Sequence, residues 1–198
     1  MKILVACEFS GVVRNEFISL GHDAWSCDLL PTDSPGPHIE GDVLEVLNYG
    51  WDLMVAHPPC TYLSNSGVSH LYKSYERWKQ MIDGACFFRE LLHAPIPKIA
   101  VENPIMHGYA KKIIGKEQDQ IIQPWMFGHP DSKATCFWLK NLPLLKKTNV
   151  LNLPKSGHWE NQTSSGQNKL PPSDDRWKLR SITFKGIAKA IADQWQIN

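Results

Sequence analysis

The sequence predicts an α/β protein with a mostly parallel central sheet and helices on both faces. Short, continuously apolar runs alternate with segments of helical period, a pattern typical of buried parallel strands joined by crossover helices. Each apolar run also stops abruptly at polar, glycine or proline residues. Because ligands bind outside the carboxyl ends of parallel strands, we expect the functional residues at these stops.

The first elements are a strand, a turn and a helix. Residues 2–6 form an apolar run, and apolar positions recur at helical spacing over 12–20, with Gly21 as the terminating glycine. A second β-like run covers 22–27. The three prolines within 31–37 exclude a helix directly after it.

The middle of the chain repeats this alternation. Residues 41–47 predict a short apolar helix or strand remnant, and 51–56 predict a strand that is buried on both faces. Apolar residues then lie on one helical face over 75–92. Further strands are predicted over 97–101 and 134–139.

The last part of the chain contains a long polar segment and a closing helix. Residues 154–178 are rich in Pro, Gly, Ser, Asn and Gln and have no apolar period, which predicts a long flexible loop. An amphipathic helix is predicted over 186–195. We find no internal repeat and no domain boundary, so we expect one domain over residues 1–198.

Composition excludes several classes of protein. Among 198 residues, 42% are hydrophobic, which suffices for a packed core. Twenty-one Lys and Arg balance twenty Asp and Glu, so the formal net charge is +1. This balance excludes a polycation and an acidic tail, and any polyanion must meet a local basic patch.

Cysteine usage and hydropathy predict a soluble, intracellular protein. No apolar run approaches the ~20 residues of a membrane-spanning helix. The five cysteines include no close C-x-x-C pair, which argues against a disulfide framework and a four-ligand zinc site. We interpret four of them as small buried apolar residues: Cys7, Cys27, Cys86 and Cys136.

Candidate binding residues follow the first strands. The loop after the first strand consists of Glu8, Phe9, Ser10 and Gly11. Its backbone amides would open a helix and face a ligand. Asp28, after the second strand, suits ribose hydroxyls, and Asp42 suits an exocyclic amine. The alternative interpretation makes both aspartates turn and cap residues.

The most distinctive stop is Pro58-Pro59-Cys60. Two prolines restrict the backbone and present one thiol rigidly at the mouth of the sheet, where it can act as a nucleophile. Glu102, followed by Asn103 at the end of the next strand, would supply a proton partner in the same crevice. The alternative is a solvated carboxylate beside a turn-forming asparagine.

A Pro-Cys pair followed by a Glu-Asn pair resembles the cytosine-5 DNA methyltransferases, in order and approximate spacing over residues 1–104. The resemblance implies a Rossmann-like S-adenosylmethionine-dependent methyltransferase fold. In this family a segment like 6–11 holds the methionine part of the cofactor, and a residue like Asp28 holds the ribose. A residue like Asp42 contacts the adenine of the cofactor. We assign Pro58 to the cofactor site as well. The segment 180–184 resembles the one that closes the cofactor pocket.

The implied chemistry is covalent. The Cys60 thiolate adds to carbon 6 of cytosine while Glu102 bonds ring nitrogen 3, and carbon 5 then takes the methyl group. Burial would favour the protonated Glu102 that this step needs, whereas Cys60 must ionise near neutral pH. The resemblance implies DNA as partner, with the target base flipped from its stack, and a cytoplasmic location in a bacterial or phage-infected cell.

Two features of the family are missing here: the arginine-bearing Q-x-R-x-R segment and the large target-recognition domain. We expect Lys133 or Thr135 to take over part of the base contact that an arginine of this segment makes in the family. The segment 61–79, with Ser64 and Asn65 as candidate substrate contacts, either closes over the base or is an ordinary polar connection.

No large target-recognition domain is present, as in small phage and prophage forms. Sequence specificity should therefore be low, absent or borrowed, and a homodimer or a specificity partner is left open. One alternative is the same chemistry on RNA or a free pyrimidine nucleotide. Another is an inactive DNA- or protein-binding factor of phage origin. Metal dependence is the weakest option, because the eight histidines form no H-x-x-x-H pair.

Overall fold

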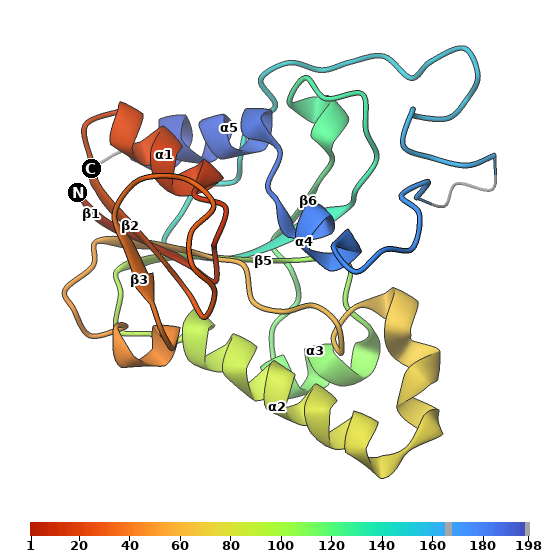
Figure 1. The fold of residues 1–198 in the computed structure, drawn as a ribbon, viewed down its shortest axis with the longest axis horizontal. Coiled ribbons are helices and arrows are strands. Elements are labelled where there is room, and N and C mark those ends of the chain that lie inside the picture. Colours follow the sequence, from red (N-terminus) through yellow and green to blue (C-terminus); the bar gives the residue numbers. More distant parts are fainter. Residues whose placement is uncertain (165–167, 197–198) are drawn as a thin grey trace.

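The computed structural model describes residues 1–164 and 168–196, which contain a seven-stranded sheet (Figure 1). The strands are β1 (Lys2–Ala6), β2 (Asp23–Asp28), β3 (His38–Glu40), β4 (Leu53–Ala56), β5 (Lys98–Asn103), β6 (Gln120–Ile122) and β7 (Thr135–Lys140). Their spatial order is β3-β2-β1-β4-β5-β7-β6.

The sheet is mostly parallel. β1 pairs in parallel with β2 and β4, and β4 pairs in parallel with β5. Only β7, among the described strands, runs antiparallel to its neighbours β5 and β6. The chain moves outward from β1 to β3 and then returns to β4 on the other side of β1. Ligand crevices form at the carboxyl ends of strands beside such a reversal.

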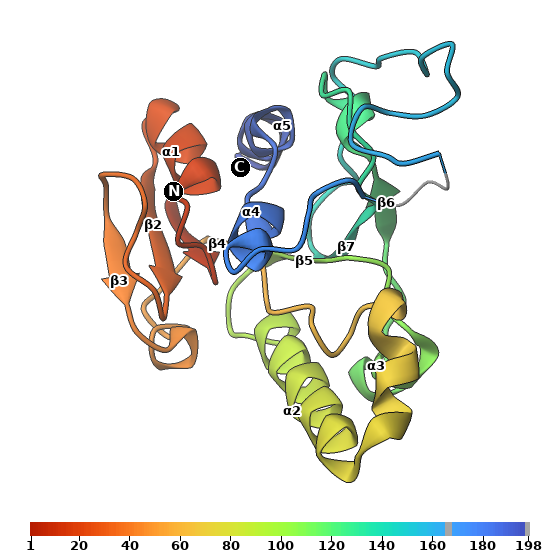
Figure 2. The ribbon, with the colours of Figure 1, turned by 45° about the vertical axis from the view of Figure 1, so that its right-hand side comes forward.

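Helices cover both faces of the sheet. The α-helices are α1 (Val12–Ser19), α2 (Tyr75–Leu92), α3 (Gly108–Ile114), α4 (Arg176–Ser181) and α5 (Lys185–Trp195). Short 3₁₀ helices are η1 (Val43–Glu45), η2 (Asn65–Lys73) and η3 (Pro124–Met126). Figures 1 and 2 show α1 and α5 on one face and α2 and α3 on the other. None of the described helices is both long and apolar enough to cross a membrane.

Strand β4 serves two separate cores. Successive side chains of a strand point to opposite faces, so a strand covered on both sides must be apolar throughout. Leu53 and Val55 pack in the core that includes α1 and α5. Met54 and Ala56 pack in the core that includes α2 and α3. This arrangement is why the run over β4 shows no polar alternation.

The predicted α/β class, with its mostly parallel sheet and helices on both faces, is confirmed. The strand over 2–6 and the helix over 75–92 have the predicted bounds. Helix α2 begins after Ser74, whose hydroxyl accepts the N–H of Arg77 at 3.3 Å. Helix α1 ends before Gly21, which has the left-handed conformation (φ 81°) that glycine adopts without strain.

The elements that were not predicted include the short β3, α3 and β6. Strands β3 and β6 have three residues each and incomplete burial, so no apolar run marks them. Helix α3 has seven residues and starts at Gly108, a weak helix former. Its start is capped by His107, whose ring Nδ1 accepts the N–H of Ala110 at 3.2 Å.

The polar segment 154–178 is partly tied to the rest of the protein. Trp159 is buried and stacks on Trp125, with the ring centroids 6.1 Å apart. Helix α4 begins inside the segment. Residues 165–167 of the segment lie outside the described part of the chain. The predicted mobility of the segment stays a prediction.

Candidate active site

A cleft of about 700 Å³ lies at the carboxyl ends of β1, β2, β4 and β5. Pockets for small molecules usually measure roughly 300–1,000 Å³. Residues at or just beyond these strand ends line it: Cys7, Asp28, His57, Pro58, Cys60, Glu102 and Asn103. The cleft therefore lies where the reversal of strand order predicts a ligand.

Cys60 lines the cleft four residues after the end of β4. Pro58 and Pro59 fix the backbone direction in front of it, and Pro58 is buried. The Cys60 carbonyl accepts the N–H groups of Leu63 and Ser64 at 3.1 and 3.0 Å. The thiol is thus held between a rigid proline pair and a hydrogen-bonded turn.

Strand β5 brings Glu102 and Asn103 to the same cleft. Asn103 Nδ2 donates to the carbonyl oxygen of Pro58 at 3.0 Å, which ties the end of β5 to the loop that carries Cys60. Asn103 is 1% exposed, and its Oδ1 has no hydrogen-bond partner in the described part of the chain. Asn103 thus holds the loop through Nδ2 and lines the cleft together with Glu102.

The electrostatics of Cys60 and Glu102 are opposed. Burial raises the pKa of the Cys60 thiol, and the charge of Glu102 raises it further, against Lys133 and Arg180, which lower it. Burial also acts to raise the pKa of Glu102. However, the hydrogen bond and charge of His57, together with Lys133, hold this pKa below its usual value. Both directions are the reverse of the sequence-based expectation, in which burial favours a protonated Glu102 and Cys60 ionises near neutral pH.

Asp28 and Asp42 both line the cleft and both hold the backbone. Asp28 Oδ1 accepts the N–H of Leu30 at 3.0 Å, and Asp42 Oδ1 accepts that of Leu44 at 2.9 Å. Burial raises the pKa of Asp28. A carboxylate has about four acceptor positions, more than these backbone hydrogen bonds use, so the capping and binding interpretations are compatible.

Of the four residues in the first predicted loop, only Phe9 lines the cleft. The Glu8 carboxylate is buried and accepts the N–H groups of Val13 and Arg14 at 2.7 and 3.3 Å. It thereby caps the start of α1 from within the protein. Ser10 and Gly11 lie outside the cleft lining, so the α1 amides are used internally.

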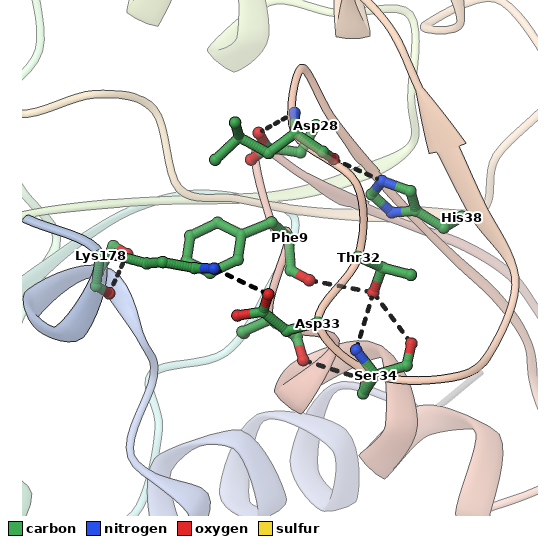
Figure 3. Close-up of polar contacts among 10 residues, drawn as sticks. Phe9, Asp28, Thr32, Asp33, Ser34, His38 and Lys178 are labelled. Carbon is green, nitrogen blue, oxygen red and sulfur yellow. Dashed lines mark hydrogen bonds and ion pairs between the residues drawn. The ribbon is translucent and has the colours of Figure 1, made fainter. Parts of the chain in front are cut away.

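The loop between β2 and β3 supports Phe9. Thr32 Oγ1 donates to the carbonyl oxygen of Phe9 at 3.0 Å (Figure 3). The guanidinium of Arg14 is buried beneath this loop and donates to the carbonyl oxygens of Ser34 and Pro35, each at 3.0 Å. The loop that replaces a crossover helix here is therefore fixed by hydrogen bonds.

Helix α4 lies against this end of the cleft. Lys178 Nζ pairs with Asp33 Oδ1 at 2.9 Å and lies 5.1 Å from the ring centre of Phe9 (Figure 3). Trp177 contacts Phe9 edge to face, with the centroids 6.3 Å apart. Trp177 and Arg180 also line the cleft. The C-terminal part of the chain thus completes a site built by the N-terminal strands.

The remaining residues, predicted as substrate contacts, do not all line the cleft. Lys133 and Ser64 line the cleft, whereas Thr135 lines a neighbouring cavity of about 10 Å³. Asn65 is exposed and lines neither; its N–H donates to the carbonyl oxygen of Ile105 at 2.8 Å. Lys133 Nζ donates to the carbonyl oxygen of Arg180 at 2.7 Å. The charge of Lys133 lowers the pKa of both Glu102 and Cys60, and the charge of Arg180 lowers that of Cys60.

His57 and Trp177 belong to the cleft although sequence reasoning did not select them as site residues. His57 carried a usable signal, because it is a titratable residue directly after a buried strand. Trp177 carried none, since its place depends on how a polar segment folds back. Within 180–184, Arg180 and Ser181 line the cleft.

Comparisons with known proteins add only distant structural likenesses. No family model matches the chain, and no curated protein matches its sequence. One similar structure is described as a candidate DNA modification methyltransferase encoded within an E. coli prophage, with a TM-score of 0.47 and 11% identity. Another is a methyltransferase of Entamoeba histolytica, with a TM-score of 0.45 and 16% identity.

Both likenesses cover 75% of this chain, and they cover 51% and 57% of those structures. The chain thus spans about half the length of the structures it matches. Similarity at this level carries no argument about chemistry. The fold class itself, a Rossmann-like sheet in the strand order given above, stands on the topology of this chain.

Proposed function

We propose that the chain is an S-adenosylmethionine-dependent methyltransferase that acts on carbon 5 of cytosine in DNA through a covalent adduct of Cys60. One observation carries the proposal: Cys60 and Glu102 line the same cleft as Asp28 and Asp42. A nucleophile with a proton partner and two carboxylates suited to a nucleoside therefore share one space. The Pro-Cys and Glu-Asn pairs that resemble the cytosine-5 family supply the nucleophile and the proton partner.

The residues present fit S-adenosylmethionine. The remaining acceptor positions of the Asp28 and Asp42 carboxylates suit ribose hydroxyls and an exocyclic amine, and Phe9 and Trp177 offer ring surfaces for a purine. A cleft of about 700 Å³ is large enough for such a ligand. When bound, S-adenosylmethionine supplies an electrophilic methyl group.

Cys60 and Glu102 divide the remaining work. The Cys60 sulfur forms a bond to carbon 6, and Glu102 hydrogen-bonds and protonates nitrogen 3, which makes carbon 5 nucleophilic. The charge of Glu102 is one cause of the raised pKa of Cys60. A proton on Glu102 removes that charge, so protonation of the carboxyl group and ionisation of the thiol favour each other.

Lys133 is the candidate for the base contact that an arginine makes in the family. Its ammonium group lies in the cleft and acts on the pKa of both Cys60 and Glu102. A cytosine inside a duplex would have to leave its stack to reach these groups, at a cost of a few kcal/mol. Single-stranded DNA should therefore be the better acceptor when no partner assists.

The proposal is tested by measuring methyl transfer from labelled S-adenosylmethionine to single-stranded DNA, duplex DNA, RNA and dCMP in parallel. We expect 5-methylcytosine in DNA, identified after digestion to nucleosides. Product only in RNA or dCMP would replace the acceptor and keep the chemistry. Donor binding without product on any acceptor would favour a binding factor.

A further inference from the structure

His57 directly follows β4, the strand that lies between β1 and β5. Its backbone N–H donates to the carbonyl oxygen of Ala6 at 2.9 Å, which extends the pairing of β4 with β1. Its side chain is 9% exposed. The ring Nδ1 lies 3.2 Å from Oε2 of Glu102. Because an ionised carboxylate can only accept, Nδ1 carries the hydrogen in this contact.

The second ring nitrogen of His57 has no partner in the described part of the chain. Nε2 is buried and makes no hydrogen bond there. His57 and Glu102 also line the cavity of about 10 Å³, together with Lys133, Thr135 and Thr183. A space of about 10–15 Å³ with several polar neighbours is the size that holds one water molecule. His57 thus contacts a carboxylate through Nδ1 and also lines a space large enough for one water molecule.

The charged and titratable groups around the pair come from every neighbouring element. Lys133 lowers the pKa of Glu102, and the charge of Glu102 raises the pKa of Cys60 and of Cys136. The cleft lining that includes His57 and Glu102 also contains Cys7 after β1, Cys60 after β4, Lys133 before β7 and Arg180 in α4, and Cys136 in β7 is affected by the charge of Glu102. His57 makes a direct side-chain hydrogen bond to Glu102.

We propose that His57 is the positioning residue of Glu102: its Nδ1–H holds Oε2, so that the carboxyl group exchanges its proton with the substrate base through Oε1. This inference rests on the proposed function and extends it to a residue outside the motifs that resemble the family. Because His57 holds Oε2, the other carboxyl oxygen, Oε1, is left for nitrogen 3 of the base. The hydrogen bond from His57 also stabilises the carboxylate that forms when the proton leaves.

The assisted step balances without any further reactant. The Cys60 thiol first gives its proton to the Glu102 carboxylate. The thiolate sulfur then forms a bond to carbon 6, the carbon 5–carbon 6 electron pair shifts toward carbon 4, and nitrogen 3 takes the proton that Glu102 has received. His57 keeps its hydrogen bond to the carboxylate that remains. When sulfur leaves after methylation, the proton of nitrogen 3 returns to Glu102 and the proton of carbon 5 passes to solvent.

Two variants separate positioning from mere packing. In His57→Asn an amide N–H replaces Nδ1–H and keeps the donor on a side chain that cannot ionise, whereas His57→Leu keeps volume and removes the donor. We expect the turnover number to fall about 100-fold in His57→Leu and about tenfold in His57→Asn. The KM for DNA and the donor affinity should stay unchanged. His93→Asn, at an exposed position after α2, is the matched control and should behave as the wild type.

A second readout does not depend on activity. The Glu102 carboxyl group is followed by ¹³C NMR in glutamate-labelled protein and assigned by its absence in Glu102→Gln. We expect its titration to move to higher pH in His57→Leu, and less in His57→Asn, because the hydrogen bond that stabilises the carboxylate is lost or weakened.

An unchanged Glu102 titration in folded His57→Leu overturns the inference, whatever the activity. A shifted titration with wild-type turnover also overturns it, because His57 would then not serve the reaction. A wild-type chain that forms no product overturns the proposed function, and the titration then decides separately whether His57 holds the carboxyl group. Melting temperatures establish that each variant is folded.

Discussion

The two ends of the cleft are built on different principles. At the end formed by β1 and β2, the polar groups already serve the backbone: Asp28 and Asp42 each bond an N–H group, and Glu8 caps α1. At the end formed by β4 and β5, His57 has a buried ring nitrogen without a partner among the described residues, and the pKa of Glu102 is displaced by that histidine.

This difference separates binding from chemistry. Groups that are fixed by the backbone keep one geometry and lose little entropy when a ligand arrives, which suits a binding end. A carboxyl group whose pKa is set by a titratable neighbour, as that of Glu102 is by His57, can exchange a proton during a reaction, which suits a reacting end. Changes at the two ends should therefore affect different quantities.

The largest effect is expected at the reacting end, from Cys60→Ser. A hydroxyl has nearly the same shape as a thiol but ionises far less readily, so methyl transfer should fall by at least about 1,000-fold. Donor affinity, measured by calorimetry, should remain within about twofold. Cys86→Ser, in α2 and outside the cleft lining, is the control. Wild-type turnover in Cys60→Ser would remove the assigned nucleophile.

Glu102→Gln should lower methyl transfer by about 100- to 10,000-fold, because the proton donor to nitrogen 3 is lost. The same change removes the negative charge that raises the pKa of Cys60. Alkylation of Cys60 by iodoacetamide should then reach its maximal rate at lower pH, as followed by peptide mass spectrometry. An unchanged pH dependence of Cys60 alkylation in Glu102→Gln would contradict the effect of the Glu102 charge on the pKa of Cys60.

Asp28→Asn tests the binding end. Loss of the carboxylate charge should weaken donor binding about tenfold, as for a hydrogen bond to a charged group, and leave turnover at saturating donor unchanged. Asp23→Asn, at the opposite end of β2, serves as the matched control. A large loss of turnover at saturating donor would mean that the two ends are not separable.

The smallest effect is expected from Lys178→Gln, which breaks the ion pair with Asp33 beside Phe9. Both side chains are more than a third exposed, and such pairs contribute about 1 kcal/mol or less. Donor affinity should weaken by less than about fivefold, and the difference from wild type should shrink as salt is added. A larger effect would show that α4 contributes more to the binding end than its ion pair indicates.

The elements that sequence predicts well are those with uniform burial. Strand β1 and helix α2 have their predicted bounds because an apolar run and a helical period each extend over the whole element. Strands β3 and β6 gain their hydrogen bonds from neighbours in space and carry no such local signal. Local sequence therefore predicts the centre of the sheet better than its edges.

The site follows the same division. Strand ends locate Asp28, Cys60 and Glu102 at one cleft, because topology alone brings carboxyl ends together. Topology does not determine where a side chain points. Glu8 was therefore expected at the ligand, but in the structure its carboxylate caps α1. The contact of His57 with Glu102 joins residues 45 positions apart and emerges only from the pairing of β4 with β5.

The central claim is that the Cys60 sulfur bonds to the base during methyl transfer. DNA that contains 5-fluorocytosine cannot lose the group at carbon 5, so methylation should trap the adduct. Mass spectrometry is expected to show one chain joined to DNA through Cys60, with one added methyl group, and no such species in Cys60→Ser. Efficient methylation with no covalent species, or an unchanged adduct in Cys60→Ser, would contradict the account.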